Sequence, residues 1–122
     1  MKKVMILSIL AATALSSTAN AATDGTVCAA ATSAGNGTAF TAGGSSEFVK
    51  VAFTPKCSAN VHMFFAQSAN AFGAVSGSSK GKNYFGGGTG GGGVKVVAAC
   101  ATTGCSTTEM TTGNAQTQMN AS

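Results

Sequence analysis

The sequence is poor in the side chains that carry acid–base and nucleophilic chemistry. It has one histidine, His62, one aspartate, Asp24, and no arginine. A Ser-His-Asp triad would have to recruit Asp24 near the start of the chain, and no G-x-S-x-G nucleophile elbow is present. The other carboxylates are Glu47 and Glu109, and their sequence positions do not define the carboxylate spacing of a glycosidase. We therefore expect no catalytic residues and no enzymatic activity.

The sequence also lacks an apolar run long enough to cross a membrane. Val4–Leu15 is a stretch of twelve apolar or small residues, whereas a transmembrane helix needs about 20. Lys2 and Lys3 precede this stretch and the small-x-small sequence ANA ends at residue 21, which is the layout of a secretory signal peptide. The segment resembles a bacterial export signal; the alternative is a retained N-terminal anchor. We expect residues 1–21 to form a signal helix that is removed, giving a secreted protein, periplasmic or extracellular, with no membrane span.

Charge is sparse once the signal peptide is removed. The mature chain keeps five lysines against three acids, a net charge of +2, compared with +4 for the whole chain. Nucleic-acid binding depends on several cationic contacts with phosphates, usually including arginine. This composition argues against nucleic acid as a partner.

Four cysteines are present in a chain that we expect to enter an oxidising compartment. Two disulfides are the expected outcome there, and three pairings are possible. The sequence CATTGC contains a Thr-Gly turn that favours Cys100–Cys105, which leaves Cys28–Cys57. The two loops would stabilise the fold by about 2 and about 3.5 kcal/mol respectively. A zinc site is the alternative, but one Cys-x4-Cys with two remote cysteines matches its ligand spacing poorly.

Alternation of apolar and polar residues predicts several short strands. The strongest pattern is in residues 46–57, where Val49, Val51 and Phe53 fall on one face that we expect to be buried. Residues 59–67 carry large apolar groups on both faces, as in a central or covered strand. Further candidates are residues 24–31, 70–79, 82–85 and 94–100. Because no segment beyond the signal peptide shows a helical stripe, we expect an all-β fold: a small antiparallel sheet, a sandwich or a partly open barrel.

The end of the chain is polar and aperiodic. We expect residues 106–122 to be a flexible tail that contains at most one edge strand. The predicted organisation is therefore a signal peptide at residues 1–21, a single β-rich, disulfide-stabilised domain at residues 22–105, and this tail.

A run of seven glycines and one threonine occupies residues 86–93. A phosphate-binding P-loop needs G-x-x-x-x-G-K-[ST], but Lys95 comes two residues after the last glycine and Val96 replaces the hydroxyl. The run leads into a strand pattern, so no helix N-terminus would face an anion. Two interpretations remain: an exposed flexible connection, or a surface without side chains against which a neighbouring backbone or a glycan lies closely.

Metal and cofactor sites find little support. Copper binding by His62 and Met63 is disfavoured because adjacent strand residues point to opposite faces. Met110 and Met119 lie in the predicted tail and would contribute only if it folded back. We expect no cofactor and no metal.

A possible ligand contact lies in the sequence SSKGKNYFGG. Lys80 and Lys82 precede two rings, Tyr84 and Phe85. Aromatic faces stack on sugars or bases, and lysines attract acidic polymers. The alternative is a solvated hairpin in which Tyr84 or Phe85 anchors the core.

These features favour an exported, non-catalytic protein that acts by interaction at or outside the cell surface. Only Lys50 and Lys95 interrupt the two best strands, so exposed strand edges would invite self-association into a matrix, a fibre or an adhesive assembly. The second hypothesis is a small extracellular binding module for an acidic or sugar polymer, built on Lys80, Lys82, Tyr84 and Phe85. A small secreted hydrolase is the third. The sequence does not identify the partner.

Overall fold

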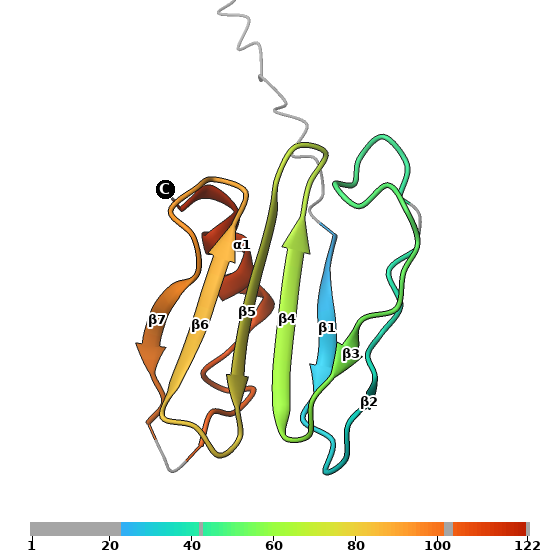
Figure 1. The fold of residues 1–122 in the computed structure, drawn as a ribbon. Helices are drawn as coiled ribbons and strands as arrows, with labels where there is room; N and C mark the ends of the chain where they lie inside the picture. Colours follow the sequence, from blue (N-terminus) through green and yellow to red (C-terminus); the bar gives the residue numbers. More distant parts are fainter. Residues whose placement is uncertain (1–22, 42, 102–103, 122) are drawn as a thin grey trace, which may run out of the picture.

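The fold is an antiparallel sheet with one helix on one of its faces. The computed structural model describes residues 23–41, 43–101 and 104–121; the predicted signal peptide, residues 1–21, lies outside them. Its strands are β1 Thr23–Ala29, β2 Gly35–Asn36, β3 Lys56–Cys57, β4 Val61–Gln67, β5 Phe72–Ser78, β6 Asn83–Gly88 and β7 Lys95–Ala99, and its helix is α1 Thr112–Asn120. The main sheet has five strands in the order β1-β4-β5-β6-β7, while β2 and β3 pair separately (Figure 1).

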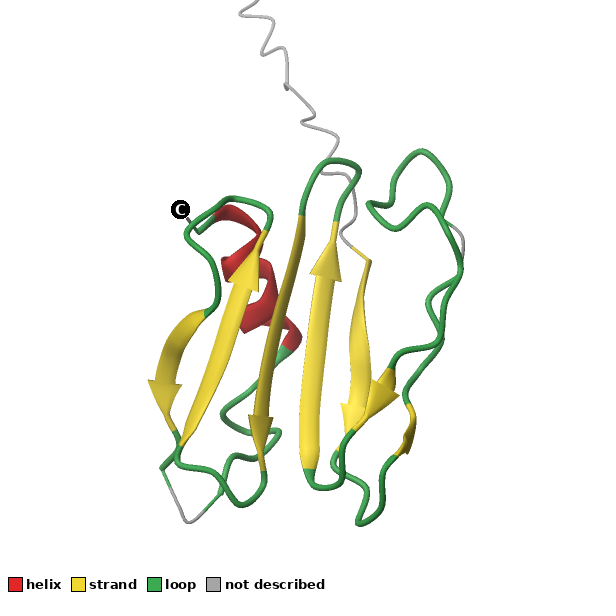
Figure 2. Ribbon diagram, in the orientation of Figure 1, coloured by secondary structure: helices red, strands yellow, loops and turns green. Residues whose placement is uncertain are grey.

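Consecutive hairpins build most of the main sheet. β4, β5, β6 and β7 follow one another in space as in sequence, and β1 pairs with the outer side of β4 (Figure 2). Short apolar segments separated by tight turns favour this meander. The prediction of a small antiparallel sheet is confirmed, as is the expectation that residues 59–67 contain a central strand covered on both faces.

The face of the sheet that packs on α1, which we call the helix face, carries the larger core. Neighbouring strands align Phe64, Val75 and Gly86 across it in direct register. The buried residues of this core come from the sheet, the segment before α1 and α1 itself: Phe64, Ala66, Val75, Tyr84, Cys105, Met110, Ala115 and Met119. Burial of this apolar surface is the main stabilising contribution to the fold.

The opposite face of β1 and β4 is covered by the connection between β2 and β3. Phe40, in that connection, packs its ring 4.6 Å from that of Phe65 and 4.9 Å from that of Phe53. The buried Gln67 side chain accepts a hydrogen bond from the Val49 N–H at 3.0 Å. The β2–β3 connection is thereby fixed over one half of this face.

Residues 46–57 do not form the strand that their alternation predicts. Only an isolated bridge joins Phe53 to Phe40, and β3 begins at Lys56. Val51 is 76 % exposed and Phe53 is 50 % exposed, so the expected buried face is wrong. A β pattern needs a partner strand along its length as well as suitable side chains, and these residues find partners only at Phe53 and in the two-residue strand β3.

The prediction of a flexible tail is also wrong for residues 112–120, which form α1. Thr111 caps the helix: its hydroxyl accepts from the Asn114 N–H, and the Asn114 side chain accepts from the Thr111 N–H. This reciprocal cap satisfies backbone donors at the helix start. Met110 and Met119 are buried in the core, so the segment does fold back onto the sheet.

Glycines on the helix face let α1 lie close to β5 and β6. A Cβ atom at Gly73 would lie 2.6 Å from the Met119 backbone nitrogen, and one at Gly86 would lie 2.8 Å from Gln118 Cγ. A Cβ at Gly88 would overlap the Gln118 carbonyl. The first part of the glycine run is therefore a close-approach surface for a neighbouring backbone. The last part is the β6–β7 turn, where residues 91, 92 and 93 have φ values of 107°, 84° and 70°, which favour glycine.

Two disulfides hold the periphery to the sheet, with the predicted pairing. Cys28–Cys57 joins β1 to β3, and Cys100–Cys105 joins the end of β7 to the segment before α1. The described residues contain no free cysteine. Within the same residues, no helix is long and apolar enough to span a membrane.

Candidate contact surface

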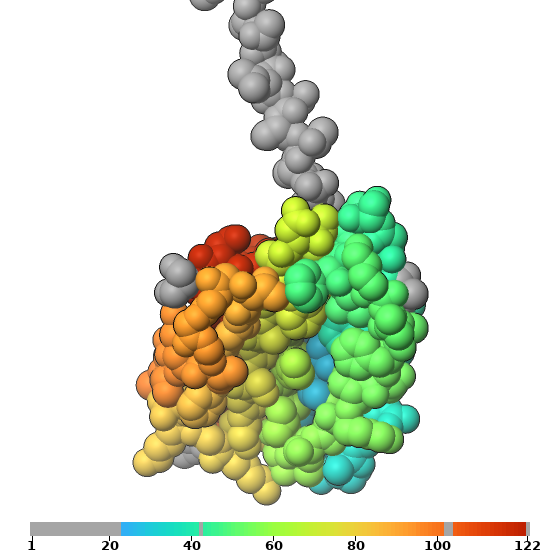
Figure 3. Space-filling model, turned by 45° about the horizontal axis from the view of Figure 1, so that its top comes forward, coloured from blue at the N-terminus to red at the C-terminus, as the bar shows by residue number. Residues whose placement is uncertain are grey.

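One half of the sheet is uncovered on the side opposite α1. This open face, as we call it, belongs to β5, β6 and β7, and cross-strand register places Ala74 beside Gly87, Ser76 beside Phe85, and Phe85 beside Val96. The β2–β3 connection covers the other half, and the surface is hollowed between that connection and the β6–β7 hairpin (Figure 3). The open face is therefore accessible to other molecules.

Large apolar side chains are exposed on the open face. Phe85 is 45 % exposed, Val96 is 53 % exposed and Val94, directly before β7, is 78 % exposed. A hollow of about 320 Å³, the Val94 hollow, lies between Val94, Phe85 and the floor formed by Met63 and Ala74. Contiguous exposed apolar surface of this kind marks interaction sites more often than isolated apolar residues do.

The open face ends at a strand whose outer edge has no partner. Among the described residues, no strand lies beyond β7 (Figure 1). The Cys100 N–H donates to the Lys82 carbonyl, and Ala99 is the next residue in the ladder, opposite Asn83. Because hydrogen-bonded and non-hydrogen-bonded pairs alternate in antiparallel sheets, the N–H and carbonyl of Ala99 point away from β6. At the other edge, the Val27 carbonyl of β1 already accepts from the Thr38 N–H at 2.9 Å.

The structure separates the two rings that the sequence places together. Tyr84 lies on the helix face and is 5 % exposed, while Phe85 lies on the open face. Tyr84 is thus a core residue and shares no ligand surface with Phe85. Alternation along β6 was the available signal, since neighbouring residues of a strand point to opposite faces.

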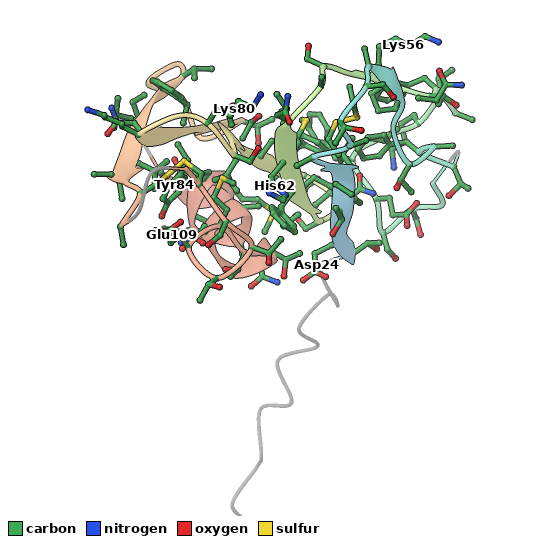
Figure 4. All side chains as sticks on the ribbon, turned by 90° about the horizontal axis from the view of Figure 1, so that it is seen from below. Asp24, Lys56, His62, Lys80, Tyr84 and Glu109 are labelled. Atoms are coloured by element: carbon green, nitrogen blue, oxygen red, sulfur yellow. A yellow bond between two sulfur atoms is a disulfide. The ribbon has the colours of Figure 1, made fainter. Side chains whose placement is uncertain are left out.

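Lys82 does lie near Phe85. Both line a second hollow of about 510 Å³, the Lys82 hollow, together with Ser76, Ser78 and Asn83. Lys80 is exposed in the adjoining β5–β6 turn, on the side of the sheet away from α1 (Figure 4). The sequence alone does not bring Ser76 and Ser78 to this site, because their proximity to Phe85 depends on the pairing of β5 with β6. For Asn83, two residues before Phe85 on β6, the alternation of faces along the strand was the available signal.

The three carboxylates have separate structural partners. Asp24 accepts a hydrogen bond from Gln116 of α1 at 2.9 Å, and Glu47 accepts one from Thr23 at 3.2 Å. Glu109 accepts from the backbone N–H groups of Ala101 and Ser106, one at either side of the Cys100–Cys105 loop. These bonds, with the Ala101 bond the largest cause, hold the pKa of Glu109 below its ordinary value of 4.5.

His62 and Met63 point to opposite faces. His62 is opposite Gly77 on the helix face, and Met63 is opposite Ser76 on the other. The buried Nδ1 of His62 has no hydrogen-bond partner among the described residues. No three His, Cys, Asp or Glu side chains of the described residues gather in an arrangement that could hold a metal ion.

The chain matches no known protein-family model, no curated protein and no solved structure.

Proposed function

We propose that this is an exported, non-catalytic protein that acts at or outside the cell surface by contact with other molecules. Its contact region is the open face together with the outer edge of β7. The two disulfides support an oxidising compartment, and the signal-peptide pattern of residues 1–21 supports export. The observation that carries the proposal is the free edge of β7 beside the exposed Phe85, Val94 and Val96.

A second copy of the chain is the partner that we propose for the β7 edge. Unpaired N–H and carbonyl groups of an edge strand bind another extended strand, and natural edges are usually protected by charge, proline or a covering segment. Within β7, Lys95 is the only charged residue, and proline is absent. Antiparallel pairing of two β7 strands would extend the sheet and bring the exposed valines of both copies together.

Light scattering coupled to size-exclusion chromatography tests the assembly. The oxidised protein, residues 22–122, is expected to show a mass that rises above that of the monomer as its concentration increases. Ala99→Pro removes an outward N–H that β6 does not use, and Val96→Lys adds a charge to the exposed edge. Both variants are expected to shift the protein toward the monomer.

Val51→Lys is the matched control, because Val51 is more exposed than Val96 (76 % against 53 %) but lies in the β2–β3 connection. It should assemble like the unmodified protein. Circular dichroism and the melting temperature establish that each variant is folded. A protein that stays monomeric at every concentration, or assembly that Ala99→Pro and Val96→Lys leave unchanged, would rule out pairing through β7.

A further inference from the structure

We infer that the Lys82 hollow binds an anionic polysaccharide, with a sugar ring on Phe85 and a sugar carboxylate at Lys82. The inference goes beyond self-association, because it names a second kind of partner and a part of the open face away from the β7 edge. The hollow lies between β5 and β6, whereas the proposed self-contact is the outer edge of β7.

The backbone places an aromatic ring and polar groups on the same side of the sheet. Asn83 and Phe85 alternate along β6 and so share the open face, about 7 Å apart along the strand. Ser76 is directly opposite Phe85 on β5. With Ser78 and Lys82 these residues line a hollow of about 510 Å³, within the range of about 300–1,000 Å³ common for ligand sites.

The polar groups of the hollow are available to a ligand. The Lys82 ammonium and the Asn83 amide make no side-chain hydrogen bond to any described residue, and Ser76 Oγ, which donates to the His62 carbonyl, keeps its acceptor capacity. Phe85 is 45 % exposed, so part of its ring is free for contact. One aromatic face with a few hydrogen-bonding groups is the arrangement that a sugar ring requires, because its C–H bonds meet the negative face of the ring while its hydroxyls bond to the polar groups.

The charges around the hollow indicate an anionic ligand. Asp24 and Glu109 lie on the α1 side of the sheet, whereas Lys56 and Lys80 lie on the opposite side (Figure 4). The third acid, Glu47, is in the β2–β3 connection, where its side chain accepts a hydrogen bond from Thr23. Lys82 also lies on the side opposite α1, because it lines the Lys82 hollow there. Lysine acts as a hydrated point charge with three donors, which suits a carboxylate carried by a sugar.

A sugar chain fits this site better than a nucleic acid does. The open face exposes one ring, Phe85, whereas single-stranded nucleic acid is usually bound by successive stacked bases in a strongly cationic groove. The chain has no arginine, and the mature part carries a net charge of +2. One ring with one or two adjacent cations matches a polymer that carries one charge per sugar unit.

NMR titration tests the inference at the level of single residues. The ¹⁵N-labelled, oxidised protein is titrated at low salt with oligogalacturonate, whose sugar units each carry a carboxylate. Saturable shifts are expected at the amides of Lys82, Asn83 and Phe85. The fully methyl-esterified oligomer keeps the sugar rings but has no charge. Its affinity should be lower by a factor of about ten or more.

Two pairs of variants separate the contribution of the Phe85 ring to binding from that of the Lys82 charge. Phe85→Ala is expected to weaken binding about tenfold, whereas Phe53→Ala, which removes a ring of similar exposure, should leave it unchanged. Lys82→Ala is expected to weaken binding about fivefold and reduce its salt dependence. Lys56→Ala should have no effect, since Lys56 bonds to Asn36 in the β2–β3 sheet.

The inference is overturned if oligogalacturonate causes no saturable shifts, or shifts that lie outside the hollow. Equal affinity for the methyl-esterified oligomer, unchanged binding by Phe85→Ala, or tighter binding of a single-stranded DNA oligomer would each overturn it as well. A monomer that binds oligogalacturonate would contradict self-association and leave the sugar site intact. A protein that assembles but binds no oligogalacturonate would overturn the sugar site and leave self-association intact.

Discussion

At the scale of single residues, glycine determines how closely the helix approaches the sheet. Gly73, Gly86 and Gly88 present hydrogen atoms where other residues would present a Cβ. The backbone of α1 occupies the space at Gly73 and Gly88, and the Gln118 side chain of α1 occupies it at Gly86. Interiors pack at crystal-like density, so an added methyl group displaces its neighbours. Because successive residues of β6 point to opposite faces, an added Cβ would meet α1 only at every second residue of this strand.

Gly88→Ala should lower the free energy of unfolding by about 1–3 kcal/mol. Its methyl group would meet the Gln118 carbonyl of α1. Gly87→Ala is the matched control on the open face of the same strand, where the closest atom to an added Cβ is 3.3 Å away. Urea denaturation measures both, and an equal effect of the two substitutions would contradict this packing.

Glu109 ties together the two ends of the Cys100–Cys105 loop. Its carboxylate accepts from Ala101 and from both the N–H and the hydroxyl of Ser106. Hydrogen bonds to the ionised form favour it, which lowers the pKa in the folded state. A lowered pKa contributes stability above the unfolded value of 4.5, and this contribution is lost as the pH falls through the folded pKa.

The comparison of Glu109→Gln with the unmodified protein isolates this contribution. The unmodified protein should be the more stable at neutral pH, and its advantage should shrink as the pH falls below about 4.5, because the glutamine does not titrate. Urea unfolding at a series of pH values gives the difference directly. A difference that stays constant down to strongly acidic pH would show that the Glu109 carboxylate does not favour its ionised form in the folded protein.

At the scale of elements, sequence patterns predict the strands of the main sheet, both in its middle and at its edges. Residues 61–67 and 72–78 become β4 and β5, in the middle of the sheet, and their apolar content reflects cover on both faces. Residues 46–57 carry a stronger alternation but pair only at Phe53 and in the two-residue strand β3. Periodicity describes what a strand can bury, and whether it finds a partner is decided by contacts far away in the sequence.

Helix α1 shows the opposite case, in which tertiary contact creates an element that local pattern does not predict. The sequence TGNAQTQMN contains glycine, asparagine and threonine and only two apolar residues, Ala115 and Met119. Helical stability in proteins comes mainly from packing of one face rather than from propensity. Here Ala115 and Met119 pack against Gly73 of β5, a surface that sequence alone does not bring to residues 112–120.

Met119→Ala should reduce the free energy of unfolding by about 2–5 kcal/mol, since Met119 is 9 % exposed and belongs to the main core. Thr117→Ala, on the exposed side of α1, should change it little. The midpoints of urea denaturation compare the two variants. If residues 112–120 were a flexible tail, neither substitution would matter, and a neutral Met119→Ala would contradict the docked helix.

At the scale of the whole molecule, the sheet has one closed side and one half-open side. Helix α1 covers the first, the β2–β3 connection covers part of the second, and β5, β6 and β7 remain accessible. The sequence indicates the ingredients of the candidate site, Lys82 and Phe85. It does not show that Tyr84 leaves that site for the core or that Ser76 joins it, because both depend on strand register.

Hydrogen exchange at Ala99 tests the central claim, that β7 pairs with another copy through its outer edge, most directly. In a monomer the Ala99 N–H faces solvent, while the Ala98 N–H points into the ladder with β6 and serves as the internal reference. With pairing, protection of the Ala99 amide should rise strongly between micromolar and millimolar protein while that of Ala98 stays high. An Ala99 amide that exchanges equally fast at both concentrations would contradict the account.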